Sequence, residues 1–209
     1  MLIPKERKKI FEIFLKDPYN EIHLRKIARL SSVSLTNVHN TMNSLAKDSM
    51  FIKKDISNMS LFKADICNES LLKVFESLEL EKRQDFYNKN KNIARLLQKY
   101  TQSIINLSGK KIQLVVLFGS VARSQWDKKS DIDILAVSPE KKNGITAVLD
   151  KAKTEVSPLL QINPVSTSIE KFQEGIRKRT EFYNELWNDR IILYNEFLFW
   201  QLVKEGAER

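Results

Sequence analysis

Two short pieces of the sequence carry residue types that could bind a phosphate and a metal ion. In the first, Gly119 and Ser120 follow an apolar run, Ile112 to Phe118, and precede a segment without a helix breaker. A strand that ends in Gly-Ser and turns into a helix presents free backbone N–H groups at the positive end of a helix dipole. Glycine lets the backbone approach a phosphate closely, and the serine hydroxyl can donate a hydrogen bond to it. This piece predicts an anion site.

Asp131 and Asp133 form the second piece, at the start of an apolar run that ends at Val137. Side chains two residues apart in a strand project from the same face, so the two carboxylates repel each other unless a cation lies between them. Hard oxygen ligands beside a phosphate favour Mg²⁺, with Mn²⁺ as the alternative. Either piece alone could be an ordinary turn or a strand cap. Together, between two buried strands, they predict a nucleotide- and metal-binding site.

This stretch resembles the nucleotidyltransferase family of the DNA polymerase β superfamily. The family signature has Gly-Ser after a first strand, Ala-Arg in the next helix and Ser-Asp-x-Asp at the next strand; the matching residues are Gly119, Ser120, Ala122, Arg123, Ser130, Asp131 and Asp133. The resemblance implies that Gly119 and Ser120 hold the triphosphate of an NTP, with ATP as the expected one. It also implies nucleotide contacts from Arg123 and Ser130, and catalytic, metal-binding roles for Asp131 and Asp133. Ser124 departs from the usual Arg-Gly.

The third carboxylate of the family is missing from the sequence. Enzymes of this type usually carry it on the following strand, where it completes one metal site near the attacking hydroxyl. The corresponding stretch, Leu160 to Val165, has Asn163 in that place. An amide oxygen can ligate Mg²⁺, but it brings no charge and cannot act as a base. Glu155 and Glu170 are close in sequence, although nothing in the sequence fixes their position. The asparagine is therefore expected to affect catalytic turnover more than nucleotide binding.

Residues 1–68 predict a separate domain of short helices followed by a hairpin. Leu24, Ile27, Ala28 and Leu30 have helical spacing and are expected to face inward, and Ser34 is a candidate N-cap. The order of elements resembles that of winged helix-turn-helix DNA-binding domains. The predicted elements are helices at 4–16, 24–30 and 34–47 and strands at 51–56 and 61–66.

The third helix and the hairpin carry polar and basic side chains that can reach base edges or phosphates. These candidate DNA-binding residues are Thr36, Asn37, His39, Asn40, Asn43, Lys47, Lys53 and Lys54. Residues 1–68 hold 12 basic and 7 acidic residues, and the chain has a net charge of +9, which favours double-stranded DNA as a partner. The helix itself has one lysine and no arginine. A winged helix used for protein contacts or for a homodimer therefore stays open.

The rest of the sequence predicts an α/β (α+β) architecture. Residues 69–108 contain no glycine or proline and are predicted as a helical linker of one or two helices. Residues 109–209 alternate short apolar runs with helical patterns, which agrees with a polymerase-β-type nucleotidyltransferase domain. Its third strand, Leu159 to Val165, is expected near a sheet edge because Pro164 cannot donate to a neighbouring strand.

Composition limits the compartment. With Cys67 as the only cysteine, an internal disulfide is excluded, which fits a reducing environment. The charged start of the chain lacks the apolar core of a signal peptide, and no apolar run approaches the ~20 residues of a membrane span. We expect a cytoplasmic protein without a membrane partner.

Two functions compete. The first is transfer of an NMP from NTP, with Mg²⁺, to a hydroxyl acceptor, coupled to a DNA-binding domain; the intact Asp131 and Asp133 favour it. A protein acceptor stays open, because minimal nucleotidyltransferase antitoxins with the same pattern adenylylate their partner toxins. The second is a DNA-binding transcriptional regulator whose nucleotidyltransferase domain binds nucleotide without turnover, which Asn163 favours. The domain combination is similar to archaeal-type nucleotidyltransferase-domain regulators. A structural dimer with a decayed site is a third possibility.

Overall fold

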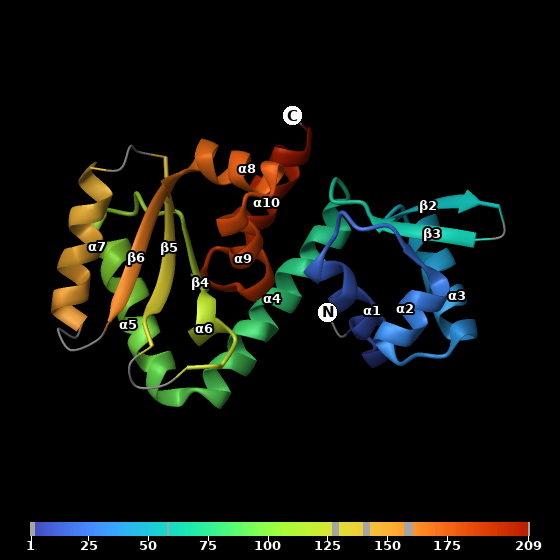
Figure 1. Ribbon diagram of the computed structural model, residues 1–209, viewed down its shortest axis with the longest axis horizontal. Coiled ribbons are helices and arrows are strands. Elements are labelled where there is room, and N and C mark those ends of the chain that lie inside the picture. The colour runs from blue at the N-terminus through green and yellow to red at the C-terminus, as the bar shows by residue number, and fades with distance from the viewer. Residues whose placement is uncertain (1–2, 58, 127–129, 140–142, 157–160, 209) are drawn as a thin grey trace. The chain divides into compact units, whose positions relative to one another are not determined.

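The computed structural model describes residues 3–57, 59–126, 130–139, 143–156 and 161–208. The chain folds as two compact units, Met1–Leu78 and Glu79–Arg209, both visible in Figure 1. Both α-helices and β-sheets are present, so the predicted mixed α/β class is confirmed in that coarse form. In the part of the chain described, no helix is both long and apolar enough to cross a membrane.

The first unit packs helices against a small antiparallel sheet with strand order β1-β3-β2. Pairing of β2 with β3 runs from Phe51 opposite Ala64 to Ile56 opposite Met59. The ring of Phe14 packs edge-on against that of Phe51, with 4.7 Å between the ring centroids. The elements are α1 (Lys5–Lys16), β1 (Ile22–His23), α2 (Leu24–Ser31), α3 (Leu35–Lys47), β2 (Phe51–Ile56) and β3 (Met59–Ala64).

Local sequence explains how α2 ends and α3 begins. Ser32 takes a left-handed conformation (φ 53°) that ends α2, and the Ser34 hydroxyl accepts a hydrogen bond from the Asn37 backbone N–H at 3.2 Å. The prediction of Ser34 as N-cap is confirmed. The expected burial of Leu30 is wrong, because its side chain is 53% exposed at the turn between the two helices.

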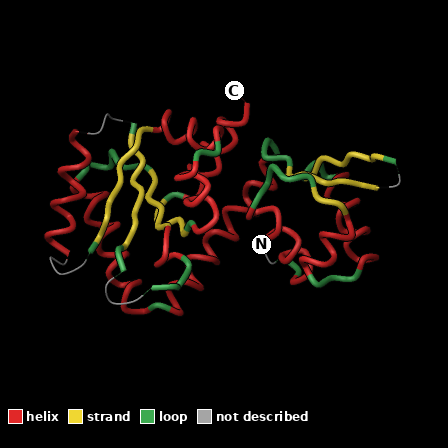
Figure 2. Tube along the Cα trace, in the orientation of Figure 1, coloured by secondary structure: helices red, strands yellow, loops and turns green. Residues whose placement is uncertain are grey.

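The second unit contains a mixed sheet with strand order β6-β5-β4-β7. Figure 2 draws its strands in yellow. Strands β5 and β6 are parallel, while β4 is antiparallel to both β5 and β7. The helix α4 (Glu69–Lys89) runs from the first unit into the second. The other elements are α5 (Lys91–Leu107), β4 (Leu114–Phe118), α6 (Gly119–Ala122), β5 (Ile132–Ser138), α7 (Asn143–Val156), β6 (Ile162–Ser168), α8 (Ile169–Lys178), α9 (Glu181–Asp189), β7 (Ile191–Tyr194) and α10 (Glu196–Glu208).

Helices cover both faces of this sheet, with α5 and α7 on one side and α8, α9 and α10 on the other (Figure 1). All of β4 is therefore buried, which explains why its sequence is a continuous apolar run without alternation. Leu97 and Tyr100 place α5, from the segment predicted as a linker, in the core beside β4. The edge position expected for the strand with Pro164 is confirmed by β6, although Leu159 and Leu160 lie outside the described residues.

Candidate active site

The sheet brings three of the expected site residues to one of its ends. Strand β4 ends at Phe118, which pairs with Asp133 of the antiparallel neighbour β5. Asp133 in turn lies opposite Asn163 of β6. Because α6 begins at Gly119, directly after Phe118, the Gly-Ser turn and the aspartate strand meet at this end.

Gly119 is required by its conformation and by its neighbour. Its φ is +74°, in the left-handed region that favours glycine. A Cβ atom at this position would lie 2.5 Å from Oδ2 of Asp133, closer than atoms can approach. The missing side chain therefore lets the Asp133 carboxylate lie directly against the turn that begins α6. Ser120, the next residue, is half-buried.

The two aspartates differ in exposure. Asp131, just before β5, is exposed, whereas Asp133 within β5 is half-buried; Ile132 between them is buried. Asp133 Oδ1 accepts a hydrogen bond of 3.0 Å from Nδ2 of Asn163. The amide that stands in place of a third carboxylate thus holds Asp133 through its NH₂ group. Ser130 precedes the pair and is half-buried.

These residues fit a magnesium ion, since Mg²⁺ is usually bound through one or two carboxylates, with substrate phosphates and water completing its shell. Among the residues described, no group of three or more histidine, cysteine, aspartate or glutamate side chains could hold a metal. Asp131 and Asp133 are the two carboxylates that would ligate such an ion, and a half-turn of the Asn163 amide would offer an oxygen in addition.

Neither nearby glutamate takes the place of the third carboxylate. Glu155, near the end of α7, accepts a hydrogen bond of 3.2 Å from the Ser103 hydroxyl of α5. Glu170 lies in the first turn of α8, which follows the far end of β6 from Asn163. Between Asn163 and the start of α8, β6 contributes 5 residues, Pro164 to Ser168, which span roughly 17 Å. Among the described residues, Asn163 therefore occupies the position of the third carboxylate, and neither Glu155 nor Glu170 replaces it.

Arg123 faces carboxylates of α9. It follows α6, and its Nη1 donates to Oδ2 of Asp189 and lies 4.0 Å from Glu185. The side chain is 38% exposed. Asp189 is a part of this site that sequence reasoning missed, because it is 66 residues away in sequence and carries no motif.

A buried ion pair lies next to Asp189 in the chain. Arg190, 2% exposed, donates through Nε and Nη2 to Oε1 of Glu79 at 2.8 and 2.6 Å. Its guanidinium also stacks 4.4 Å from the centre of the Trp187 ring. Lys82 Nζ donates to the Arg190 carbonyl at 2.6 Å. These contacts fix the corner between α9 and β7 that presents Asp189.

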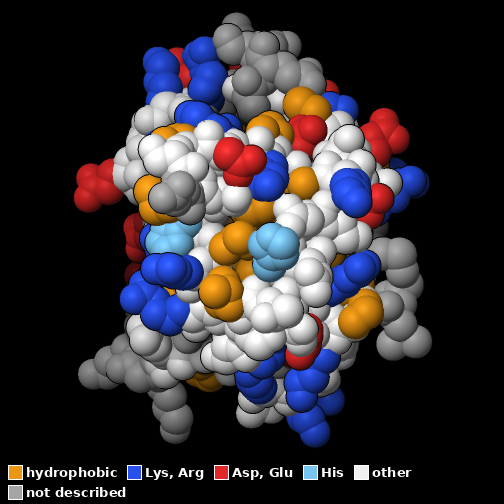
Figure 3. Space-filling model, turned by 90° about the vertical axis from the view of Figure 1, so that its right-hand side faces the viewer, with side chains coloured by type: hydrophobic (Ala, Val, Ile, Leu, Met, Phe, Trp, Pro, Cys, Tyr) orange, Lys and Arg blue, Asp and Glu red, His pale blue; other side chains and the backbone are white. Residues whose placement is uncertain are grey.

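The candidate DNA-binding residues lie on α3 and β2 of the first unit. On β2, Lys53 and Lys54 are exposed. On α3, Asn43 is half-buried and the other five candidates are exposed: Thr36, Asn37, His39, Asn40 and Lys47. Figure 3 shows one face of the molecule, on which histidine, lysine and arginine side chains are exposed among uncharged ones. Asn37 Nδ2 donates to Glu6 Oε2 at 3.2 Å.

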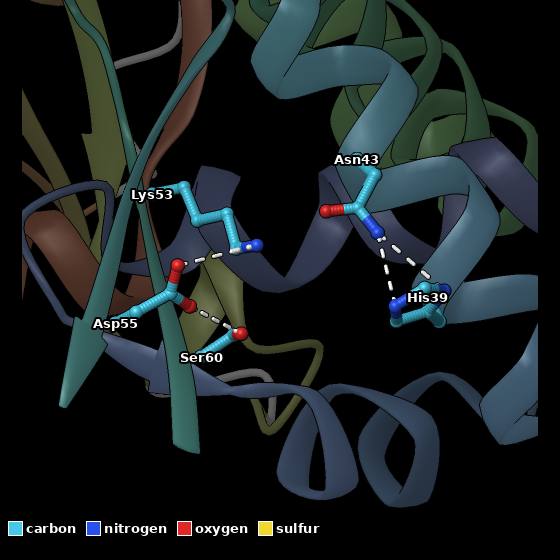
Figure 4. A network of polar contacts seen from close by, with 5 residues as sticks. All are labelled: His39, Asn43, Lys53, Asp55 and Ser60. Carbon is cyan, nitrogen blue, oxygen red and sulfur yellow. Dashed lines mark hydrogen bonds and ion pairs between the residues drawn. The ribbon is translucent and has the colours of Figure 1, made fainter. Parts of the chain in front are cut away.

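Polar contacts connect side chains within α3 and within the β2–β3 hairpin (Figure 4). On α3, Asn43 Nδ2 lies 3.1 Å from Nε2 of His39. On the hairpin, the Lys53 ammonium lies 3.4 Å from Oδ2 of Asp55, whose Oδ1 accepts a hydrogen bond of 2.5 Å from Ser60. The hydrogen bond from Ser60 and the Lys53 charge lower the pKa of Asp55. Lys54 makes a looser pair with Glu21, at 4.0 Å.

Comparison with known families matches a part of the chain that contains these residues. The family model described as nucleotidyltransferase domain matches residues 97–198, a range that holds Gly119, Asp133 and Asn163. The match supports the nucleotidyltransferase prediction for the second unit and implies a nucleotide substrate; such domains generally use divalent metal ions. No curated protein and no solved structure matches the chain.

Proposed function

We propose that the chain is a nucleotidyltransferase that moves a nucleoside monophosphate from an NTP, with ATP as the expected donor, to a hydroxyl acceptor. The observation that carries the proposal is the approach of Asp133 to Gly119, within the matched nucleotidyltransferase domain. A glycine turn for phosphate and a carboxylate for a metal lie in contact. Transfer of a phosphoryl group needs a phosphate-binding turn and a metal-binding carboxylate next to each other.

In this proposal Gly119, Ser120 and Ser130 bind the triphosphate, and Asp131 and Asp133 hold the Mg²⁺ or Mn²⁺. Bound there, the metal supplies positive charge that balances the charge of the phosphates. The acceptor oxygen forms a bond to the α-phosphorus as the bond to the bridging oxygen breaks; pyrophosphate leaves, and the hydroxyl proton passes to solvent water. Positioning and electrostatics supply most of the catalysis in such a reaction. Arg123 would reach phosphate by leaving Asp189.

A second candidate is a regulator that binds nucleotide without turnover. The hydrogen bond from Asn163 to Asp133 supports it, because a third carboxylate, which could serve as a base, is absent from this position. The Asp131 and Asp133 pair supports the enzyme more strongly, since binding alone does not require two metal ligands.

We also propose that the first unit is a winged helix-turn-helix that binds double-stranded DNA. The order of its elements, helix, strand, two helices and a hairpin paired through β1, supports this assignment. Exposed Asn40 and Lys47 on α3, with Lys53 and Lys54 on β2, would contact bases and phosphates.

The test is incubation of the protein with α-labelled ATP, CTP, GTP or UTP in Mg²⁺ or Mn²⁺, with RNA, DNA and cell extract as acceptors. We expect label on one acceptor class, proteins included. The double variant Asp131→Asn, Asp133→Asn should lose it while remaining folded. Transfer that persists in this variant contradicts the site, and saturable nucleotide binding without transfer supports the regulator instead.

A further inference from the structure

Trp126 lies beside the phosphate turn, although it belongs to none of the motifs. The chain leaves α6 at Ala122 and folds back, so that the Gln125 backbone N–H donates to the Ser120 carbonyl at 3.0 Å. Trp126 is the next residue, and its Cα is therefore about 3.8 Å from that of Gln125. The Trp126 side chain therefore starts close to the turn that holds Ser120.

The indole is held in place without being buried. Trp126 is 38% exposed, and its Nε1 donates to Oδ1 of Asn90 at 3.4 Å. Asn90 stands between α4 and α5, and its Nδ2 donates to the Phe86 carbonyl at 2.9 Å and lies 3.5 Å from the Ser124 hydroxyl. The polar edge of the ring is thus satisfied by the protein, while part of its surface stays open to solvent.

We propose that Trp126 is the platform on which the base of the bound NTP stacks; this rests on the proposed function. A partly exposed aromatic side chain can bind a nucleobase through its π-surface, and stacking of this kind is tolerant of base identity. The turn at Gly119 and Ser120 would take the phosphates, and Trp126 the other end of the same molecule.

Another exposed aromatic side chain provides a matched control. Phe197, in α10, is 60% exposed. It follows β7, whose Tyr194 pairs with Val115 at the start of β4, so it lies toward the end of the sheet away from Gly119. Phe197→Ala removes a comparable exposed ring outside the candidate site.

The experiment measures binding of ATP and of inorganic tripolyphosphate, both with Mg²⁺, by calorimetry on the full chain. We expect Trp126→Ala to weaken ATP about tenfold and to leave tripolyphosphate, which has no base, unchanged. Trp126→Phe should retain most of the ATP affinity, and Phe197→Ala should bind both ligands as the unsubstituted protein does.

Two results would overturn the platform: unchanged ATP binding by Trp126→Ala, or equal losses for ATP and tripolyphosphate. Failure of the proposed function looks different. In that case the unsubstituted protein binds neither ligand, or the double variant Asp131→Asn, Asp133→Asn binds both as well as the unsubstituted protein. Absence of binding in the unsubstituted protein overturns the platform as well.

Discussion

Gly119 couples the backbone of the phosphate turn to a carboxylate of the next strand. Its left-handed φ and the 2.5 Å approach of Asp133 Oδ2 to its missing Cβ are two separate reasons for glycine. The sequence motif explains Gly119 by the close approach of the backbone to a phosphate. The structure adds that the residue also leaves room for Asp133, a pair 14 positions apart whose contact depends on the β4–β5 register.

Gly119→Ala should therefore reduce both the stability of the protein and its nucleotidyl transfer activity. We expect the free energy of unfolding to fall by about 1–3 kcal/mol from the strained φ and the clash. Displacement of Asp133 should lower nucleotidyl transfer about 100-fold. Urea melts and initial rates would measure the two effects.

Gly109→Ala is the matched control, because Gly109 also has a positive φ (+61°) but nothing lies within 4 Å of its Cβ position. It should cost about 1 kcal/mol and leave transfer unchanged. Equal effects of the two substitutions on transfer would contradict the role of the Gly119–Asp133 contact.

Asn163→Asp should make stability depend on the metal. Without Mg²⁺ the new carboxylate faces Asp133 in place of a hydrogen-bond donor, so we expect a loss of about 1–2 kcal/mol. Added Mg²⁺ should recover it, as a rise in melting temperature larger than that of the unsubstituted protein. Asn163→Ala, which loses the bond without adding charge, should gain no more from Mg²⁺ than the unsubstituted protein does. An equally large gain in Asn163→Ala would show that the added carboxylate does not bind the metal.

At the scale of elements, strongly patterned segments could be predicted. The strands β4 and β5 follow from buried apolar runs, and α3 from Ser34 together with Val38 and Met42 at helical spacing. Contacts distant in sequence could not be predicted. Asp189 meets Arg123 only because β7 pairs with β4 and positions α9 beside α6, and no local pattern signals that arrangement.

The packing of α8 on α9 was likewise hidden from the sequence. Gly175 in α8 leaves room for the Tyr183 ring, which would lie 2.0 Å from an added Cβ. Tyr183 packs edge-on against Phe172, and burial raises its pKa. A glycine within a helix therefore marks a close contact between elements.

Gly175→Ala should destabilise the protein by about 1–3 kcal/mol, because the Tyr183 ring has to move. Gly144→Ala, at a position in α7 with nothing within 4 Å, should instead stabilise by about 0.5–1 kcal/mol. Thermal unfolding of both variants gives the comparison. A stabilising effect of Gly175→Ala would show that the ring does not occupy this space.

At the scale of the whole molecule, a buried ion pair within the second unit joins two residues that are far apart in the sequence. Glu79 and Arg190 are 111 positions apart and almost completely buried. Glu79→Ala leaves the Arg190 charge buried without its partner carboxylate, so we expect a loss of about 3–5 kcal/mol. Asp85→Ala, at an exposed position of the same helix, should stay within about 0.5 kcal/mol of the unsubstituted protein. Similar urea midpoints for the two variants would rule out a structural role for the pair.

The first unit can be tested through the charge of its hairpin. Asp55 neutralises Lys53, so Asp55→Asn should strengthen duplex DNA binding several-fold at low salt and steepen its salt dependence by about one phosphate contact. Glu12→Gln, which removes the same charge from a pair with Lys8 on α1, is the control. Equal changes in both variants, measured by fluorescence anisotropy, would show that net charge and not the hairpin is responsible.

The most direct measurement of the central claim follows two labels of the same ATP. With Mg²⁺ and an acceptor, the account predicts that the α-label appears on the acceptor while the γ-label is released as pyrophosphate, and that the double variant Asp131→Asn, Asp133→Asn does neither. Transfer of the γ-label to the acceptor, or undiminished α-label transfer by the double variant, would contradict nucleotidyl transfer at this site.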